Sequence, residues 1–324
     1  MSDQWKLGKL KLRSRNQLEL ELSGLSGGIE LKIPFHVLLG RTRKPRVLLI
    51  AGVHGDEYEG VAALHEVTKE INPEAINGAI VVVPVANPQA FYSGTRRNPV
   101  DLRDLNRSFP GNANGTMSER LANLLFCSFV MGSDAVLSMH GWSREATVIP
   151  YVEYSTKRSE AGERSFAIAS ALGLEFLHPY EWPAGLLVAS ATQHGIPSVE
   201  VEVGGMGTVT PNGLETYRRV IHRFLAHMKV LDLSNHDAQT PPPAHKVVDH
   251  CDCLSNHAGL FRSRVKVGEM VNQGQPLGKI HDLAGECLEE VHSPRAGAVA
   301  ILRTFSSVQP GDRLIQIFSE LDQR

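Results

Sequence analysis

Two histidines and a glutamate have the types and the spacing of metal ligands. His54 and Glu57 lie three residues apart in AGVHGDE, directly after an apolar, strand-like run, and His140 ends a second such run in LSMHGW. Residues that end different parallel strands meet at the carboxyl edge of one sheet. Two imidazoles and one carboxylate are a ligand set of catalytic zinc that leaves one position for water. The sequence therefore predicts one Zn²⁺ site per chain, although such ligands also suit cobalt, nickel or iron.

A further strand-like segment carries two glutamates among apolar residues. Glu200 and Glu202 lie in SVEVEV, and residues two apart on a strand face the same side. Burying a carboxylate costs free energy unless the group is paired or functional. One interpretation is a catalytic carboxylate beside the metal, and the other is an edge strand with a solvated acidic face.

A long polar segment, residues 87–111, separates the first two apolar blocks and is rich in Arg, Asn and turn-forming residues. Loops that follow core strands often carry binding residues, and guanidinium groups suit carboxylates and oxyanions. Without a metal site nearby, a solvated surface loop would be the simpler interpretation.

The elements expected to position these residues are short strands that alternate with helices. Apolar runs of this kind, separated by amphipathic segments, indicate a mostly parallel sheet covered by helices, which is the α/β class. The predicted strands span residues 46–53, 79–86, 134–139 and 198–203. The predicted helices span residues 57–71, 118–131, 159–172, 184–194 and 214–231.

The composition changes at residues 233–246, where polar residues and three successive prolines replace the helical pattern. Such a segment cannot continue a helix and favours an extended spacer. We therefore predict a main domain of residues 1–232, a linker of residues 233–246 and a small all-β domain of residues 247–324. In the last region, glycines separate short strand-like runs.

The overall composition excludes few functions. The 33 basic and 35 acidic residues give a formal net charge of −2, so no strong field favours nucleic acid or an anionic membrane as a partner. Four cysteines in 324 residues form no paired framework, as is usual in a reducing compartment. Neither a signal-peptide core nor an apolar run of about 20 residues occurs. We expect a cytoplasmic protein, and a homo-oligomer is compatible with the sequence.

Six short motifs occur in a characteristic order. They are GVHGDE, NPQAF, TR, DLNRSFPG, SMHG and VEVGG. Together they resemble the succinylglutamate desuccinylase/aspartoacylase family, a branch of the zinc carboxypeptidase superfamily, over residues 46–231. The resemblance implies a zinc-carboxypeptidase-like mixed sheet flanked by helices. It also implies a hydrolase, a deacylase that cleaves the amide bond of a small N-acyl amino acid.

The resemblance assigns roles to individual residues. His54, Glu57 and His140 fall on the zinc ligands of the family. Glu202 falls on the catalytic carboxylate, which acts as general base and then general acid. Arg96 matches the arginine that polarises the scissile carbonyl group.

The same resemblance indicates a substrate site. Asn106 and Arg107 match the pair that holds the substrate carboxylate, and Asn87 and Asp104 match supporting positions. The substrate-specific arginine and tyrosine of aspartoacylase have no clear counterpart, which argues against N-acetylaspartate. Residues 181–187 and the string VEVGGMG are closer to the bacterial branch that deacylates N-acetylated diamino acids such as N-acetyl-2,4-diaminobutyrate.

The C-terminal region resembles a biotinyl/lipoyl hammerhead domain, which offers a carrier as the non-enzyme alternative. The segment that would carry the modified lysine, residues 281–290, contains no lysine. This absence argues against a carrier and favours a module that borders the active site.

The metal-ligand pattern is also compatible with two different functions. A zinc carboxypeptidase that acts on short peptides would use the same ligands and glutamate, and a metal-binding module would keep the ligands without chemistry. Cys251 and Cys253, near His250 and His257, could indicate a second metal site. Their spacing is weak evidence, and we expect ordinary structural residues there.

Overall fold

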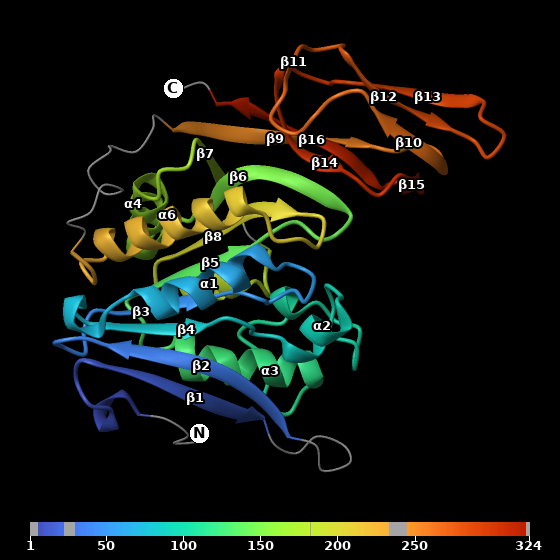
Figure 1. The fold of residues 1–324 in the computed structure, drawn as a ribbon. Helices are drawn as coiled ribbons and strands as arrows, with labels where there is room; N and C mark the ends of the chain where they lie inside the picture. Colours follow the sequence, from blue (N-terminus) through green and yellow to red (C-terminus); the bar gives the residue numbers. More distant parts are fainter. Residues whose placement is uncertain (1–5, 23–29, 182, 233–244, 322–324) are drawn as a thin grey trace.

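The computed structural model describes residues 6–22, 30–181, 183–232 and 245–321 (Figure 1). Most of the expected linker therefore lies outside the described residues, as does Trp182 in the segment of residues 181–187. The described chain forms a 12-stranded sheet, a four-stranded sheet and helices on both faces of the larger sheet.

The larger sheet contains strands from both the main and the C-terminal region. In chain order these are β1 (Ser14–Leu22), β2 (Leu31–Leu39), β3 (Arg46–Ile50), β4 (Ala79–Val83), β5 (Ala135–His140), β6 (Ala146–Ser155), β7 (Phe176–Tyr180), β8 (Ser198–Gly205), β9 (Lys246–Leu254), β11 (Met270–Val271), β14 (Gly297–Arg303) and β16 (Arg313–Glu320). Their order across the sheet is β1-β2-β4-β3-β5-β8-β6-β7-β9-β16-β14-β11.

The sheet is mixed. Strands β4, β3, β5 and β8 are parallel, and so are β6, β7 and β9, but the two blocks run in opposite directions where β8 meets β6. A parallel connection needs about a dozen residues, whereas only residues 141–145 separate β5 from β6. The mostly parallel arrangement expected from the sequence is therefore interrupted at β6.

Helices cover both faces of this sheet. They are α1 (Glu59–Glu70), α2 (Pro88–Ser93), α3 (Met117–Leu125), α4 (Glu160–Ala171), α5 (Leu187–Gln193) and α6 (Pro211–His227). One apolar core lies between the sheet and α1, α4 and α6, and the other between the sheet and α3 and α5. Figure 1 shows α1 and α6 next to each other on the near face.

Local signals explain where the helices begin and end. Helix α6 begins before the predicted residue 214 because Thr210 accepts a hydrogen bond from the Gly213 amide and Pro211 occupies the first helical position. It ends at His227, and Lys229 adopts a positive φ of 57° shortly after. Helix α3 continues into a single π-helical turn, Phe126–Val130, which completes most of the helix predicted to end at residue 131.

The C-terminal region is a β domain that also extends the main sheet. Its second sheet has the order β13 (Cys287–His292), β12 (Pro276–His281), β10 (Gly259–Ser263) and β15 (Ser307–Val308). This region has an apolar core of its own. In addition, β9 pairs with β7, β14 pairs with β6, and a shared cluster that includes Tyr151 and Phe318 fills the junction.

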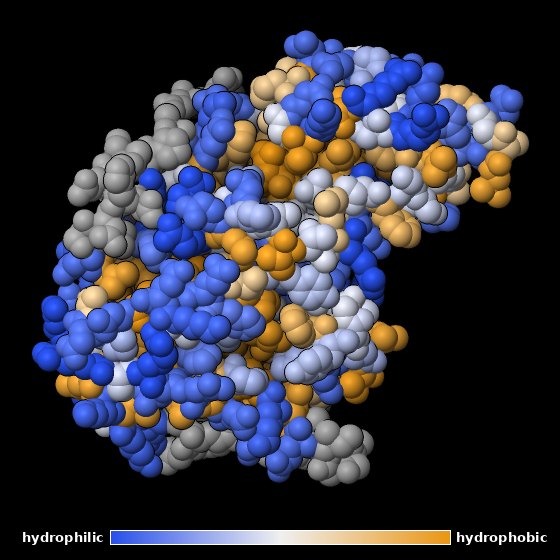
Figure 2. All heavy atoms as spheres, viewed as in Figure 1, coloured by the Kyte–Doolittle hydropathy of each residue, from blue (hydrophilic) through white to orange (hydrophobic). Residues whose placement is uncertain are grey.

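The surface in this view is mostly hydrophilic, with scattered apolar patches (Figure 2). Its outline is indented between the C-terminal strands and the main body. Within the part of the chain that the structure describes, no helix has the length and apolar character needed to cross a bilayer.

Candidate active site

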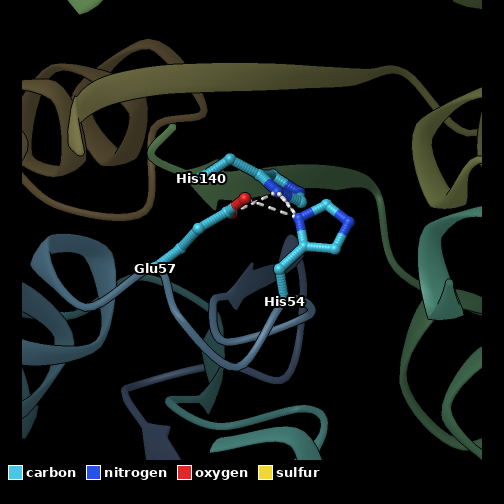
Figure 3. A group of neighbouring side chains, drawn as sticks. All are labelled: His54, Glu57 and His140. Carbon is cyan, nitrogen blue, oxygen red and sulfur yellow. Dashed lines mark hydrogen bonds and ion pairs between the residues drawn. The ribbon is translucent and has the colours of Figure 1, made fainter. Parts of the chain in front are cut away.

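The three predicted ligands converge at the carboxyl edge of the parallel block (Figure 3). His54 and Glu57 lie in the turn between β3 and α1, and His140 is the last residue of β5. Nδ1 of His54 is 2.7 Å from Glu57 Oε1, and Nδ1 of His140 is 2.9 Å from Glu57 Oε2. The two Nδ1 atoms are 3.3 Å apart. All three side chains are buried, so this set could hold a metal ion.

The outer ring nitrogens indicate how the two histidines are oriented. Nε2 of His54 lies 3.1 Å from Asp104 Oδ1, and Nε2 of His140 lies 2.9 Å from the Ser138 hydroxyl and 3.5 Å from Glu200. Because carboxylates only accept hydrogen bonds, Nε2 is the protonated nitrogen that these partners favour. In that tautomer both Nδ1 lone pairs face the Glu57 carboxylate, and a metal cation between them would hold the three electron donors together. In this arrangement the outer nitrogen of each imidazole is hydrogen-bonded to the protein, which is typical of histidines that bind a metal.

Arg96 lies between two carboxylates at the edge of the cluster. Its Nη1 is 3.2 Å from Glu57 Oε1, and its Nε is 3.2 Å from Asp104 Oδ2. Burial alone would raise the pKa of Asp104, but the hydrogen bond with His54 and the charge of Arg96 hold that pKa well below its usual range. Burial is likewise outweighed at Glu57, whose pKa is lowered by His54 and His140. Both carboxylates therefore remain ionised and keep Arg96 in place.

Glu202 lies beside the cluster and has a different environment. It is directly opposite His140 in the pairing of β5 with β8 and is 7% exposed. Its Oε2 atom is buried without a hydrogen-bond partner among the described residues. Burial, together with the negative charges of Glu57 and Glu200, raises the pKa of Glu202 well above its usual value. A buried carboxylate that accepts a proton readily has the properties of a general base.

In the polar segment of residues 87–111, some side chains line the cavity and others position neighbouring side chains. Asn106 is buried, with its side-chain oxygen accepting from the Leu187 amide and its Nδ2 donating to Glu200. Arg107 is exposed, lines the cavity and donates to the Asn106 carbonyl. Asn106 is thus fixed by the protein itself, whereas the guanidinium of Arg107 faces the cavity.

The two supporting positions of the same loop do not line the cavity. Asn87 caps α2 by accepting from the Ala90 amide, and it donates to the Val53 carbonyl in the strand–turn connection. Asp104 contacts His54 and Arg96, as described above. The structure therefore places Asn87 and Asp104 as residues that position other side chains, and not as direct substrate contacts.

Two buried contacts fix the ends of the strands that carry the site. The Tyr217 hydroxyl of α6 lies within hydrogen-bond distance of the carbonyl groups of His140 and Val201. The carboxylate of Glu59, at the start of α1, accepts from the Gly205 amide and the Thr210 hydroxyl. Gly204 has a φ of 81°, and a Cβ atom there would overlap the Glu59 carboxylate. The VEVGG motif therefore needs glycine for packing as well as conformation.

A cavity of about 330 Å³ opens beside the cluster. Its far wall consists of residues that the sequence motifs do not mark, from β6, β7, β9, β16 and the loop after β5. They are Trp142, Ser143, Tyr151, Glu153, His178, Tyr180, His250, Arg313 and Gln316. The only sequence signal for this wall was the expectation that the C-terminal module borders the active site.

Elsewhere in the described part of the chain, no comparable group of side chains occurs. A larger cavity of about 860 Å³ lies beside α6 and the start of β9, but none of its lining residues belongs to the metal cluster. Across the described ranges, two sets of side chains could hold a metal ion. One is His54, Glu57 and His140, and the other is His140, Glu200 and Glu202. The cysteines of β9 do not form one, and no part of these ranges offers a second group independent of His140.

Comparisons with known proteins agree over most of the chain. Residues 43–228 match the succinylglutamate desuccinylase/aspartoacylase catalytic domain. The chain is 32% identical over 286 residues to an N-alpha-acetyl-L-2,4-diaminobutyric acid deacetylase of Halomonas elongata. The aligned segment covers 86% of this chain and 83% of the relative.

Solved structures are similar over nearly the full length. A succinylglutamate desuccinylase/aspartoacylase from Rhodobacter sphaeroides superimposes with a TM-score of 0.86 at 28% identity, covering 97% of this chain and 98% of that chain. The product-bound ectoine utilization protein EutE (DoeB) from Ruegeria pomeroyi superimposes with a TM-score of 0.86 at 25% identity, covering 96% and 97%. The similarity includes the C-terminal strands as well as the main sheet.

Proposed function

The chain belongs to the succinylglutamate desuccinylase/aspartoacylase family, and from this premise we propose that it is a zinc-dependent amidohydrolase of small N-acyl amino acids. The observation that carries the proposal is the position of Glu202. Its buried, unpartnered oxygen lies beside a His-Glu-His cluster, at a cavity of about 330 Å³. A cavity of this volume suits an acylated amino acid better than a long peptide.

His54, Glu57 and His140 hold the metal ion in this proposal. A zinc ion bound there supplies Lewis acidity to the amide carbonyl and lowers the pKa of water. Glu202 accepts the proton of the attacking water and transfers it to the departing nitrogen. Amide and water thus give a carboxylic acid and an amine.

Two arginines position and stabilise the substrate. Arg96, held between Glu57 and Asp104, donates to the oxyanion that forms on the carbonyl oxygen. One such donor contributes roughly 3 kcal/mol to stabilisation of the transition state. Arg107 binds the carboxylate of the amino acid and so fixes the amide bond relative to Glu202.

The relative from Halomonas elongata is named for Nα-acetyl-2,4-diaminobutyrate, and we propose an N-acetylated diamino acid as the substrate of this chain. The test is amine release by the zinc-loaded protein from a panel of N-acetyl and N-succinyl amino acids, with short peptides as controls. We expect turnover of the diaminobutyrate derivative that is lost with a chelator and restored by zinc.

Two outcomes would contradict the proposal. Turnover of peptides alone would identify a carboxypeptidase. Full activity after complete removal of the metal, measured by elemental analysis, would exclude the metal-dependent reaction.

A further inference from the structure

Two carboxylates that line the cavity lie opposite each other on neighbouring strands. Glu153 of β6 is the direct neighbour of Glu200 of β8 in the antiparallel register, and both line the cavity. Directly opposed residues have Cβ atoms about 5 Å apart, and like charges at such positions destabilise a sheet. A positive charge bound in front of the two carboxylates would offset this repulsion.

A chain of hydrogen-bonding groups holds Glu153 from the other side. Glu153 Oε1 is 3.1 Å from His178 Nδ1 on β7, and His178 Nε2 is 2.9 Å from His250 Nδ1 on β9. His178 can donate from Nδ1 to Glu153 while its Nε2 accepts from Nδ1 of His250, so each of the two hydrogen bonds has one donor and one acceptor. Burial and the neighbouring His178 also hold the pKa of His250 below its usual value. The pair therefore orients the carboxylate of Glu153 through hydrogen bonds.

Aromatic rings complete this part of the wall. Tyr151 and Tyr180 line the same cavity, and the faces of such rings attract alkylammonium groups. Tyr151 neighbours Glu202 across the strands, so this wall lies next to the proposed catalytic carboxylate.

Arg313 is the feature of the wall that would favour an anionic side chain instead. Its Nε atom lies 2.9 Å from Asp252, and its guanidinium lies 5.4 Å from the centre of the Trp142 ring. Its charge is therefore balanced by Asp252 and its face is covered by Trp142. Arg107 remains the guanidinium that is available to the substrate carboxylate.

We infer that Glu153, positioned by His178 and His250 and flanked by Tyr151 and Tyr180, forms a subsite for a short ammonium side chain on the amino acid that is released. The inference rests on the proposed function and extends it, because it assigns substrate choice to these residues. The ligand class is an N-acyl α-amino acid with one amine at the end of a short side chain.

The test compares two substrates of the same shape, Nα-acetyl-2,4-diaminobutyrate and Nα-acetyl-norvaline, which differ in having an ammonium or a methyl group. We expect the zinc-loaded wild-type protein to favour the first in kcat/KM, and Glu153→Gln to reduce that preference at least tenfold. Glu19→Gln makes the same chemical change at an exposed position of β1, at the edge of the sheet, and should leave the preference unchanged.

His250→Gln provides a second variant that spares both carboxylates. Because it removes the end of the hydrogen-bonded chain, we expect a smaller loss of preference, about threefold. An unchanged preference in both folded variants, or a wild-type protein that does not favour the ammonium substrate, would overturn the subsite while leaving the amidohydrolase proposal in place. Failure of the wild-type protein to hydrolyse any N-acyl amino acid would remove both.

Discussion

The two ends of the active-site cavity are encoded in different ways. At the metal end, His54 and Glu57 come from one turn and His140 ends one strand, so short motifs contain all three. At the far end, Glu153 and His178 are single polar positions on separate strands, and further groups come from the C-terminal strands. Short motifs mark the proposed metal ligands, whereas no motif marks the residues of the far wall, which meet through the register of strands that are distant in sequence.

The difference suggests how such a protein can vary. Changes on β6, β7 or β9 would alter the proposed subsite while the turn that carries the proposed ligands stays intact. Changes in the ligand turn affect the reaction with every substrate. Variants at the two ends should therefore separate loss of chemistry from loss of selectivity.

The largest expected effect comes from comparing two substitutions of buried histidines, one at the metal end of the cavity and one at the far end. We expect His140→Ala to lose both zinc and measurable turnover, because it removes a ligand. His178→Ala should keep its zinc, since it removes no ligand atom, and should lose selectivity for the ammonium substrate. Elemental analysis and circular dichroism of both folded variants provide the measurement. Equal zinc content in the two would show that His140 is not a ligand.

The second effect separates metal binding from proton transfer at the same end. Glu202→Gln keeps the size of the side chain but removes the base, so we expect kcat to fall roughly 10²- to 10⁴-fold. Zinc content should stay at the wild-type value, because Glu202 is not one of the three proposed ligands. A variant as active as the wild type would exclude Glu202 as the base.

The smallest effect concerns the loop that carries Arg96 and Arg107. Burial raises the pKa of Asp101, but hydrogen bonds from the amide and hydroxyl of Ser118 outweigh it and lower that pKa below its usual value. A carboxyl whose pKa is lower in the folded state stabilises the fold at pH values above its pKa in the unfolded chain. This contribution disappears as the pH falls through the pKa of the folded state. We expect Asp101→Asn to lower the free energy of unfolding at pH 7 by about 0.5 kcal/mol, given partial exposure.

Denaturant unfolding at several pH values provides the measurement for Asp101→Asn. The difference from the wild type should shrink below about pH 4, because protonated aspartate and asparagine then resemble each other. A difference that stays constant with pH would mean that the ionised carboxylate does not cause it. Zinc content should be unaffected, in contrast to His140→Ala.

The sequence predicted the centre of the fold well. The apolar runs coincide with β3, β4, β5 and β8, and each predicted helix overlaps an observed one. Strand β6 was not predicted because its residues, ATVIPYVEYS, mix apolar, polar and proline positions. Its partners β8, β7 and β14 come from distant segments, and no local pattern encodes such pairing.

The candidate site divides in the same way. The motifs placed His54, Glu57 and His140 together, and the structure brings their ligand atoms within hydrogen-bond distance. Nothing in the sequence around Glu153 or His178 distinguishes them from ordinary strand residues. Their proximity follows from the parallel register of β6 and β7, which only the folded sheet defines.

The contribution of β16 to the cavity has a consequence for biosynthesis. The proposed metal ligands leave the ribosome long before Arg313 and Gln316, which line the cavity from β16. A nascent chain that has reached only α6 already contains every proposed ligand and the catalytic glutamate, but it lacks the C-terminal part of the recognition wall. The cavity wall is therefore the last part of the proposed active site to be completed.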